Sequence, residues 1–126
     1  MDKISLLFVE DEPDIRFIVE LALARSNFTL TTFDSGRDAL DALFGSSNSF
    51  DLALVNFQLP TMTGPEFMRR LRQFPTFEVL PFILVTAMVF GRGEEEPADP
   101  YLLGVISKPF DATALGESIK ALLPSK

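Results

Sequence analysis

The sequence predicts one α/β domain in which helices cover both faces of a five-stranded parallel sheet. The first observation is a set of three uniformly apolar runs at residues 4–9, 52–55 and 82–85, the pattern of strands buried on both faces. The second is that amphipathic segments separate these runs, so that strand and helix alternate along the 126 residues. With right-handed crossovers, this order gives a doubly wound (βα)5 sheet with strands ordered 2-1-3-4-5.

Two further strands complete the predicted sheet. Residues 29–33 are β-branched and mixed in polarity, which suits an edge strand. Val105 and Ile106, with their neighbours, form a fifth and weaker candidate. We expect one domain over residues 1–126, with no internal repeat and no linker.

Four helices are predicted from the spacing of apolar residues. The first covers residues 13–26 and has a proline in its first turn, and the second covers residues 36–44 and ends at Gly45. The third opens at Pro65; the last begins at Asp111, a good N-cap, and ends near Pro124. The residues expected to face the core are Ile15, Ile18, Val19, Ala22, Ala39, Leu40, Leu43, Phe44, Phe67, Met68, Leu71, Phe74, Ala112, Leu115, Ile119 and Leu122. Those expected to point outward are Arg69, Arg70 and Arg72.

A fourth crossover helix, between the last two strands, has a poor sequence. Residues 91–100 contain two glycines and two prolines, which oppose a long helix. We therefore expect a short or disordered segment there.

The composition excludes several classes of function. The net charge of −7 argues against direct binding of nucleic acid. The chain has no cysteine and no histidine, which excludes thiol chemistry, histidine bases and the usual zinc ligands. The longest apolar stretch, residues 80–90, is too short to span a bilayer, and the N-terminus is not a secretory signal. We expect a cytoplasmic protein without a membrane segment.

Polar residues stand at the carboxyl ends of four predicted strands, the edge where doubly wound sheets bind ligands. Glu10, Asp11 and Glu12 follow the first strand; such carboxylates suit Mg²⁺, although an acidic loop capping the first helix is the alternative. Asn56, Thr86 and Lys108 end or follow the third, fourth and fifth strands. A metal site, a hydroxyl and an ammonium at one edge form an arrangement for phosphoryl transfer.

At these residues the chain resembles the receiver domain of two-component response regulators, a flavodoxin-like fold. The segments that carry the resemblance are LLFVEDEPDIR, DLALVNFQLPTMTGPEFMRRLR, PFILVTA and ISKPF. The resemblance extends over essentially the whole chain. It implies a non-enzymatic signalling protein of a two-component or phosphorelay pathway, whose partner is a histidine kinase or a histidine phosphotransfer protein.

The resemblance also implies a role for each site residue. Glu10 and Asp11 match the acidic pair that holds Mg²⁺, and the backbone carbonyl of Gln58 would be a further ligand. Thr86 matches the hydroxyl that moves toward the phosphoryl group, and Lys108 the lysine that pairs with it. In this family the peptide bond between Lys108 and Pro109 is typically cis. Asn56 stands where the family has its phosphoacceptor aspartate, which is also a metal ligand.

The amide at position 56 departs from the family pattern. A neutral amide is a far poorer nucleophile than a carboxylate, so we expect no phosphorylation at this position. An aspartate would add a third anion to Glu10 and Asp11; with Asn56, like-charge crowding is relieved. We therefore expect weaker Mg²⁺ binding and an apo fold more stable by roughly 1 kcal/mol. Asn56 is either native, in a domain that works by binding alone, or an engineered replacement of aspartate.

The face that transmits the signal in this family is also unusual. Val105 occupies the position of a common aromatic switch residue, and Met88, Val89 and Phe90 come soon after Thr86. These three residues either pack under a remodelled loop or form an apolar patch for a homodimer or an effector.

Three hypotheses for the function follow from the sequence. The first is a receiver domain blocked at its acceptor position, and the second is a phosphorylation-independent interaction module on the same fold. The third, a small enzyme on this scaffold, is disfavoured because the chain lacks histidine, cysteine and a glycine-rich phosphate loop. No effector domain follows Lys126, so we expect a stand-alone regulator or an excised fragment.

Overall fold

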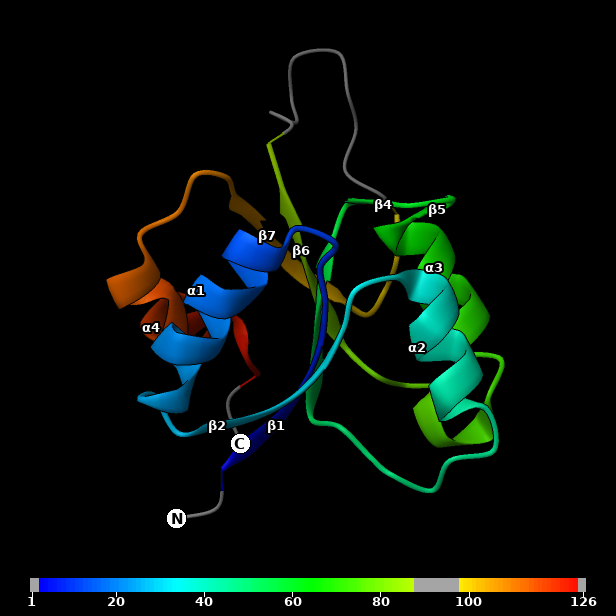
Figure 1. The fold of residues 1–126 in the computed structure, drawn as a ribbon. Helices are drawn as coiled ribbons and strands as arrows, with labels where there is room; N and C mark the ends of the chain where they lie inside the picture. Colours follow the sequence, from blue (N-terminus) through cyan, green and yellow to red (C-terminus); the bar gives the residue numbers. More distant parts are fainter. Residues whose placement is uncertain (1–2, 88–97, 125–126) are drawn as a thin grey trace.

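The computed structural model describes residues 3–87 and 98–124, and its centre is a five-stranded parallel sheet (Figure 1). The strands are β1 (Ile4–Val9), β2 (Phe28–Phe33), β3 (Leu52–Asn56), β6 (Phe82–Thr86) and β7 (Leu102–Ser107). Their order across the sheet is β2-β1-β3-β6-β7, and every neighbouring pair is parallel. This is the predicted order 2-1-3-4-5, so the fold class is confirmed.

Helices cover the two faces of the sheet in pairs. Figure 1 shows α1 (Pro13–Ala24) and α4 (Leu115–Leu122) on one side, and α2 (Gly36–Leu43) and α3 (Gly64–Leu71) on the other. A 3₁₀ turn, Pro75–Phe77, follows α3, and another, Ala112–Ala114, leads into α4. Asp111, predicted as the N-cap of the last helix, caps this 3₁₀ turn instead: its carboxylate accepts a hydrogen bond from the Thr113 amide at 3.0 Å, and α4 begins only at Leu115. No helix within the described ranges is long and apolar enough to cross a membrane.

The core consists of one apolar cluster on each face of the sheet. Successive residues of a strand point to opposite faces, so Leu7 and Val9 of β1 join the cluster under α2 and α3, while Leu6 and Phe8 join the cluster under α1 and α4. All five residues of β3 and all five of β6 are buried. These two strands therefore contain two of the three apolar runs seen in the sequence, and β1 contains the third.

Some elements differ from the prediction. The fifth strand is longer than Val105 and Ile106 alone, running over Leu102–Ser107. A small antiparallel hairpin of β4 (Gln58–Leu59) and β5 (Met62–Thr63), which was not predicted, lies between β3 and α3. The segment expected to be short or disordered covers residues 91–100, of which residues 91–97 lie outside the described part of the chain.

Three orientation predictions were wrong. Ile18 was assigned to the core, but it is 43% exposed because Val19 and Leu23 form the buried stripe of α1. Phe44 is 75% exposed because α2 ends one residue before it. Arg72 was expected in solvent, yet its guanidinium lies between the rings of Phe82 and Tyr101, 5.1 Å from each centroid.

The inward position of Arg72 joins the end of α3 to the start of β7. Its Nη1 contacts Asp99 Oδ2 at 2.7 Å, and the other oxygen of Asp99 accepts the Tyr101 amide at 2.9 Å. A guanidinium can bury its flat face against aromatic rings while it binds a carboxylate. The sequence did not reveal this because Asp99 lies 27 residues away from Arg72.

The β4–β5 hairpin contains a strained residue. Thr61 has a φ of 67°, a value that is unfavourable for a β-branched residue. Since the Thr61 side chain is exposed, a Thr61→Gly change removes the strain without losing packing. We predict that the free energy of unfolding rises by about 0.5–1 kcal/mol, measured by urea denaturation. Gly45, with a φ of 72° and open space around it, provides the control: Gly45→Ala should lower stability. Equal or lower stability of Thr61→Gly would contradict the strain.

Candidate functional site

The site lies at the carboxyl edge of the sheet, where the strand register aligns four chain segments. Val9 pairs with Val55, so Glu10, the residue after β1, lies beside Asn56, the last residue of β3. Asn56 in turn pairs with Val85, and Thr86 with Ser107. The loops that follow these strands therefore open into the same space.

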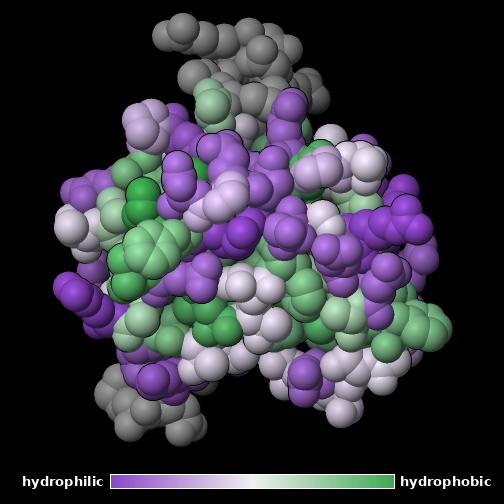
Figure 2. Space-filling view, in the orientation of Figure 1, coloured by the Kyte–Doolittle hydropathy of each residue, from purple (hydrophilic) through white to green (hydrophobic). Residues whose placement is uncertain are grey.

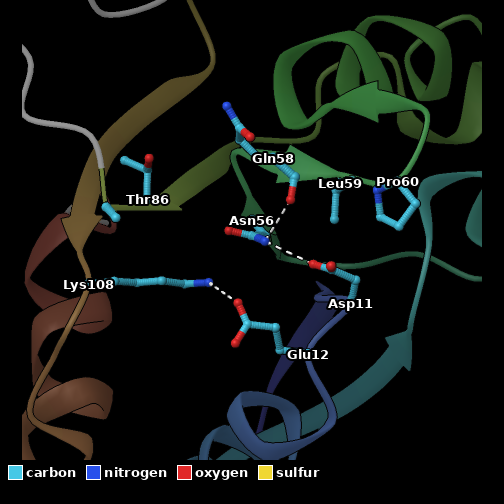
Figure 3. Close-up of a pocket in the computed structure, with 9 residues that line it drawn as sticks. Asp11, Glu12, Asn56, Gln58, Leu59, Pro60, Thr86 and Lys108 are labelled. Atoms are coloured by element: carbon cyan, nitrogen blue, oxygen red, sulfur yellow. Dashed lines mark hydrogen bonds and ion pairs between the residues drawn. The ribbon is translucent and has the colours of Figure 1, made fainter.

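A single cavity of about 670 Å³ occupies this edge, and Figure 3 shows its lining side chains. The predicted residues that line it are Asp11, Asn56, Gln58, Thr86 and Lys108. The structure thus brings all the predicted site residues together; Glu10 alone among them does not line the cavity, because it is fully buried, but it contacts Lys108 and Asn56.

Glu10 is a buried carboxylate held from several directions. Lys108 Nζ lies 3.0 Å from Glu10 Oε1, while Glu10 Oε2 accepts hydrogen bonds from Asn56 Nδ2 and from the Glu12 amide, both at 3.2 Å. Burial raises the pKa of Glu10 above its ordinary value, and the hydrogen bond and charge of Lys108 act in the opposite direction. A buried charge requires such partners, so Glu10 makes Lys108 and Asn56 part of one network.

Asn56 turns its amide nitrogen toward acidic and carbonyl oxygens. Besides Glu10, its Nδ2 donates to Asp11 Oδ1 at 3.1 Å and to the Gln58 carbonyl at 2.8 Å. Figure 3 shows the nitrogen facing Asp11 and Gln58 and the side-chain oxygen facing the Thr86 and Lys108 side of the cavity. The amide is 6% exposed, so its orientation is fixed by these neighbours.

The loop after Asn56 requires a close approach between backbones. Gly64 opens α3, and its amide donates to the Phe57 carbonyl at 2.7 Å. A Cβ at position 64 would lie only 2.7 Å from the Asn56 carbonyl oxygen, so any other residue would push the helix away from β3. Gly64 therefore allows the start of α3 to pack against the end of β3.

Lys108 and Thr86 line the side of the cavity that lies opposite Asp11 and Gln58 (Figure 3). Lys108 Nζ also lies 3.9 Å from Glu12 Oε1, and the Lys108 amide donates to the Thr86 carbonyl at 2.8 Å. The peptide bond between Lys108 and Pro109 is cis, as the resemblance implied. A backbone hydrogen bond thus joins the end of β6, which carries Thr86, to the loop after β7, which carries Lys108.

Two residues make contacts in the site that the sequence did not predict. Glu12 lines the cavity and faces Lys108, whereas the sequence predicted it only as one of three carboxylates after the first strand. Arg16 donates from Nη1 to the Glu10 carbonyl at 2.9 Å. Its position one turn into α1 was a usable signal, since that places its side chain beside the end of β1.

The donor set suits Mg²⁺ in its chemistry but not in its present arrangement. The carboxylates of Glu10 and Asp11 and the carbonyl of Gln58 are hard oxygen ligands of the kind Mg²⁺ prefers. However, the amide nitrogen of Asn56 is within 3.2 Å of an oxygen from each of them. An N–H group cannot ligate a cation, so these residues do not fit a metal ion while Asn56 keeps this orientation.

Within residues 3–87 and 98–124, no other carboxylate takes the place of the Asn56 side chain. Asp51, at the other end of β3, accepts the Ser5 amide at 2.8 Å near the opposite edge of the sheet. Asp11 is bonded to the Asn56 amide. The cavity therefore contains a hydroxyl, an ammonium and an amide, but position 56 supplies no anionic nucleophile.

The chain is similar to a known protein family and to several of its members. The family model for the response regulator receiver domain matches residues 6–120. The transcriptional regulatory protein CseB of Streptomyces avermitilis is 33% identical over 126 residues, covering 97% of this chain and 50% of CseB. The response regulator ArlR of Staphylococcus aureus is 33% identical over 123 residues, covering 94% of this chain and 52% of ArlR. This chain therefore spans about half the length of these curated relatives.

A solved structure supports the same fold. The chemotaxis response regulator CheY4 of Vibrio cholerae superimposes with a TM-score of 0.78 at 23% identity, over 96% of this chain and 99% of CheY4. Response regulators act with histidine kinases or histidine phosphotransfer proteins, and Mg²⁺ binding in the acidic pocket is typical of their receiver domains. The oxygens of Glu10, Asp11 and the Gln58 carbonyl at the carboxyl edge of the sheet form what we call the acidic edge. The match over residues 6–120, together with the parallel sheet and this acidic edge, shows that this chain belongs to the response regulator receiver domain family of two-component signalling.

Proposed function

We propose that this chain is a receiver domain over residues 1–126 that acts in a two-component or phosphorelay pathway without accepting a phosphoryl group at position 56. It works in the cytoplasm with a histidine kinase or a histidine phosphotransfer protein. The observation that carries the proposal is Asn56 itself, a buried amide at the end of β3 that faces Lys108 and Thr86 across the cavity.

The chemistry of the amide supports a silent acceptor position. In the family reaction a carboxylate attacks phosphorus and an acyl phosphate forms, whereas a neutral amide is a poor nucleophile. Lys108 and Thr86 are in place at the cavity, so the surroundings favour a working site with one changed side chain. We further propose that Mg²⁺ binds more weakly here than beside an aspartate.

Restoring the carboxylate tests this function. The unmodified chain and Asn56→Asp are incubated with a small-molecule phosphodonor and Mg²⁺, and intact mass is measured. We expect one added phosphoryl group on Asn56→Asp and none on the unmodified chain, because only the variant has the nucleophile. Asn56→Asp combined with Asp11→Asn is the control and should stay unlabelled.

Two other outcomes are informative. Labelling of the unmodified chain would contradict the proposal, since another residue would then accept the phosphoryl group. Labelling of neither protein would favour the alternative, a phosphorylation-independent interaction module on the same fold.

The surface beside the cavity supports a protein partner. Phe17, Ile18 and Leu21 of α1 are 62%, 43% and 52% exposed, and Figure 2 shows hydrophobic side chains gathered over this helix. We call these three residues the α1 patch. Because α1 begins two residues after Asp11, a protein bound to the α1 patch would also reach the cavity.

The sequence predicts a partner surface on a different face, formed by Met88, Val89, Phe90 and Val105. Met88, Val89 and Phe90 lie outside the described residues. Val105 is half-buried and packs against the apolar cluster under α2 and α3. A homodimer or effector contact through that face stays a prediction, and the α1 patch is the surface that we propose for the histidine-containing partner.

A substitution in the α1 patch tests the partner surface. Phe17→Ser should weaken binding of a purified histidine phosphotransfer protein on the order of tenfold, because an exposed aromatic anchor is lost without a change in the core. Phe44→Ser is the matched control, since Phe44 is equally aromatic and 75% exposed but lies at the end of α2. Calorimetric affinities that are equal for Phe17→Ser and Phe44→Ser would exclude the α1 patch.

A further inference from the structure

We propose that the Asn56 amide nitrogen is a built-in substitute for a divalent cation, bonded by the oxygens that would otherwise hold the metal. The chain therefore keeps one arrangement of its acidic edge whether or not Mg²⁺ is present. The proposal deepens the proposed function, on which it rests only in taking these oxygens as the metal site.

The first argument is the number of oxygens around one nitrogen. Nδ2 lies 2.8 Å from the Gln58 carbonyl, 3.1 Å from Asp11 Oδ1 and 3.2 Å from Glu10 Oε2. An amide has two hydrogens, so three acceptors share two donors. Three oxygens converging on one electropositive centre is the arrangement around a cation rather than that around an ordinary hydrogen-bonded asparagine.

The second argument is electrostatic. Two of the three acceptors are carboxylates, and the one on Glu10 is fully buried. Hydrogen bonds to charged acceptors are stronger than neutral ones. If the amide rotated by half a turn, Oδ1 would face three oxygens and leave the two carboxylates without these donors. The side chain is therefore held with its nitrogen inward.

The third argument concerns what Lys108 does and does not neutralise. Its Nζ contacts the other oxygen of Glu10, Oε1, and lies toward Glu12. Asp11 Oδ1 and Glu10 Oε2 both face the amide. Lys108 thus contacts one oxygen of Glu10, and Asn56 contacts the other together with Asp11. A metal ion bound by Glu10 Oε2 and Asp11 Oδ1 would have to displace the amide.

Removal of the amide distinguishes a competitor of the metal from a weak ligand. If Asn56 only supplied a poor ligand through Oδ1, Asn56→Ala would bind Mg²⁺ more weakly than the unmodified chain. If its nitrogen occupies the metal's place, Asn56→Ala opens the oxygens and binds Mg²⁺ more tightly. The two accounts predict opposite signs, and neither requires phosphorylation, so the result is independent of the phosphodonor experiment.

The experiment measures Mg²⁺ affinity by calorimetry and melting temperature in EDTA and in millimolar Mg²⁺. We expect Asn56→Ala to bind Mg²⁺ on the order of tenfold more tightly than the unmodified chain. We also expect Mg²⁺ to raise the melting temperature of Asn56→Ala but not that of the unmodified chain. The matched control is Asn48→Ala, which removes the same amide from the exposed loop before β3. Its behaviour should equal that of the unmodified chain. Equal or weaker Mg²⁺ binding by Asn56→Ala would overturn the proposal.

A measurement on the unmodified chain guards against a variant that fails to fold. The two side-chain amide protons of Asn56 are followed by ¹⁵N-edited NMR during a Mg²⁺ titration. We expect their signals to stay unchanged up to millimolar Mg²⁺. A progressive, saturable shift of both signals would show that the metal displaces the amide readily and would overturn the proposal.

Discussion

The buried carboxylate of Glu10 is the constraint on which the site depends. It stands at the end of β1, fully enclosed, beside the end of β3. A carboxylate in such a place needs donors and a cation, because burial penalises its charged form. Lys108 reaches it from the loop after β7, and Asn56 reaches it from β3. The network therefore links the carboxyl ends of three strands. Its geometry follows from the need of the Glu10 carboxylate for hydrogen-bond donors and a positive charge.

The same network explains why an amide is tolerated at position 56. An aspartate there would face Glu10 and Asp11 and would need a cation between them. Asparagine keeps nearly the same shape and reverses the polarity at one atom, from an acceptor to a donor. The acidic edge is then satisfied within the chain itself. On the proposed function, the site then lacks an anionic nucleophile at position 56, although the arrangement of the residues around it is kept.

The sequence predicted the fold and the location of the site because both follow from local patterns. The uniformly apolar strands fix the sheet, and the polar residues at their ends fall at the ligand-binding edge of any doubly wound fold. Asp11, Asn56, Thr86 and Lys108 could thus be grouped before any coordinate was known. The structure adds the observation that these four residues line one cavity at the carboxyl edge of the sheet.

Other features depend on contacts that no local pattern contains. The orientation of the Asn56 amide is set by three oxygens, two of which lie about 45 residues away in sequence. Arg72 was assigned to solvent because its partner Asp99 is distant in the chain. The exposed α1 patch arises from a choice between two neighbouring apolar stripes on one helix, and periodicity alone did not decide which stripe faces the sheet.

The central claim is that the neutral amide stabilises an otherwise crowded acidic edge. The most direct measurement is the free energy of urea unfolding of the unmodified chain and of Asn56→Asp, both in EDTA. Asn48→Asp adds the same charge in an exposed loop and serves as the reference. The account predicts that Asn56→Asp is less stable than the unmodified chain by about 1 kcal/mol, with a smaller change for Asn48→Asp. An Asn56→Asp protein as stable as the unmodified chain, or more stable, would contradict it.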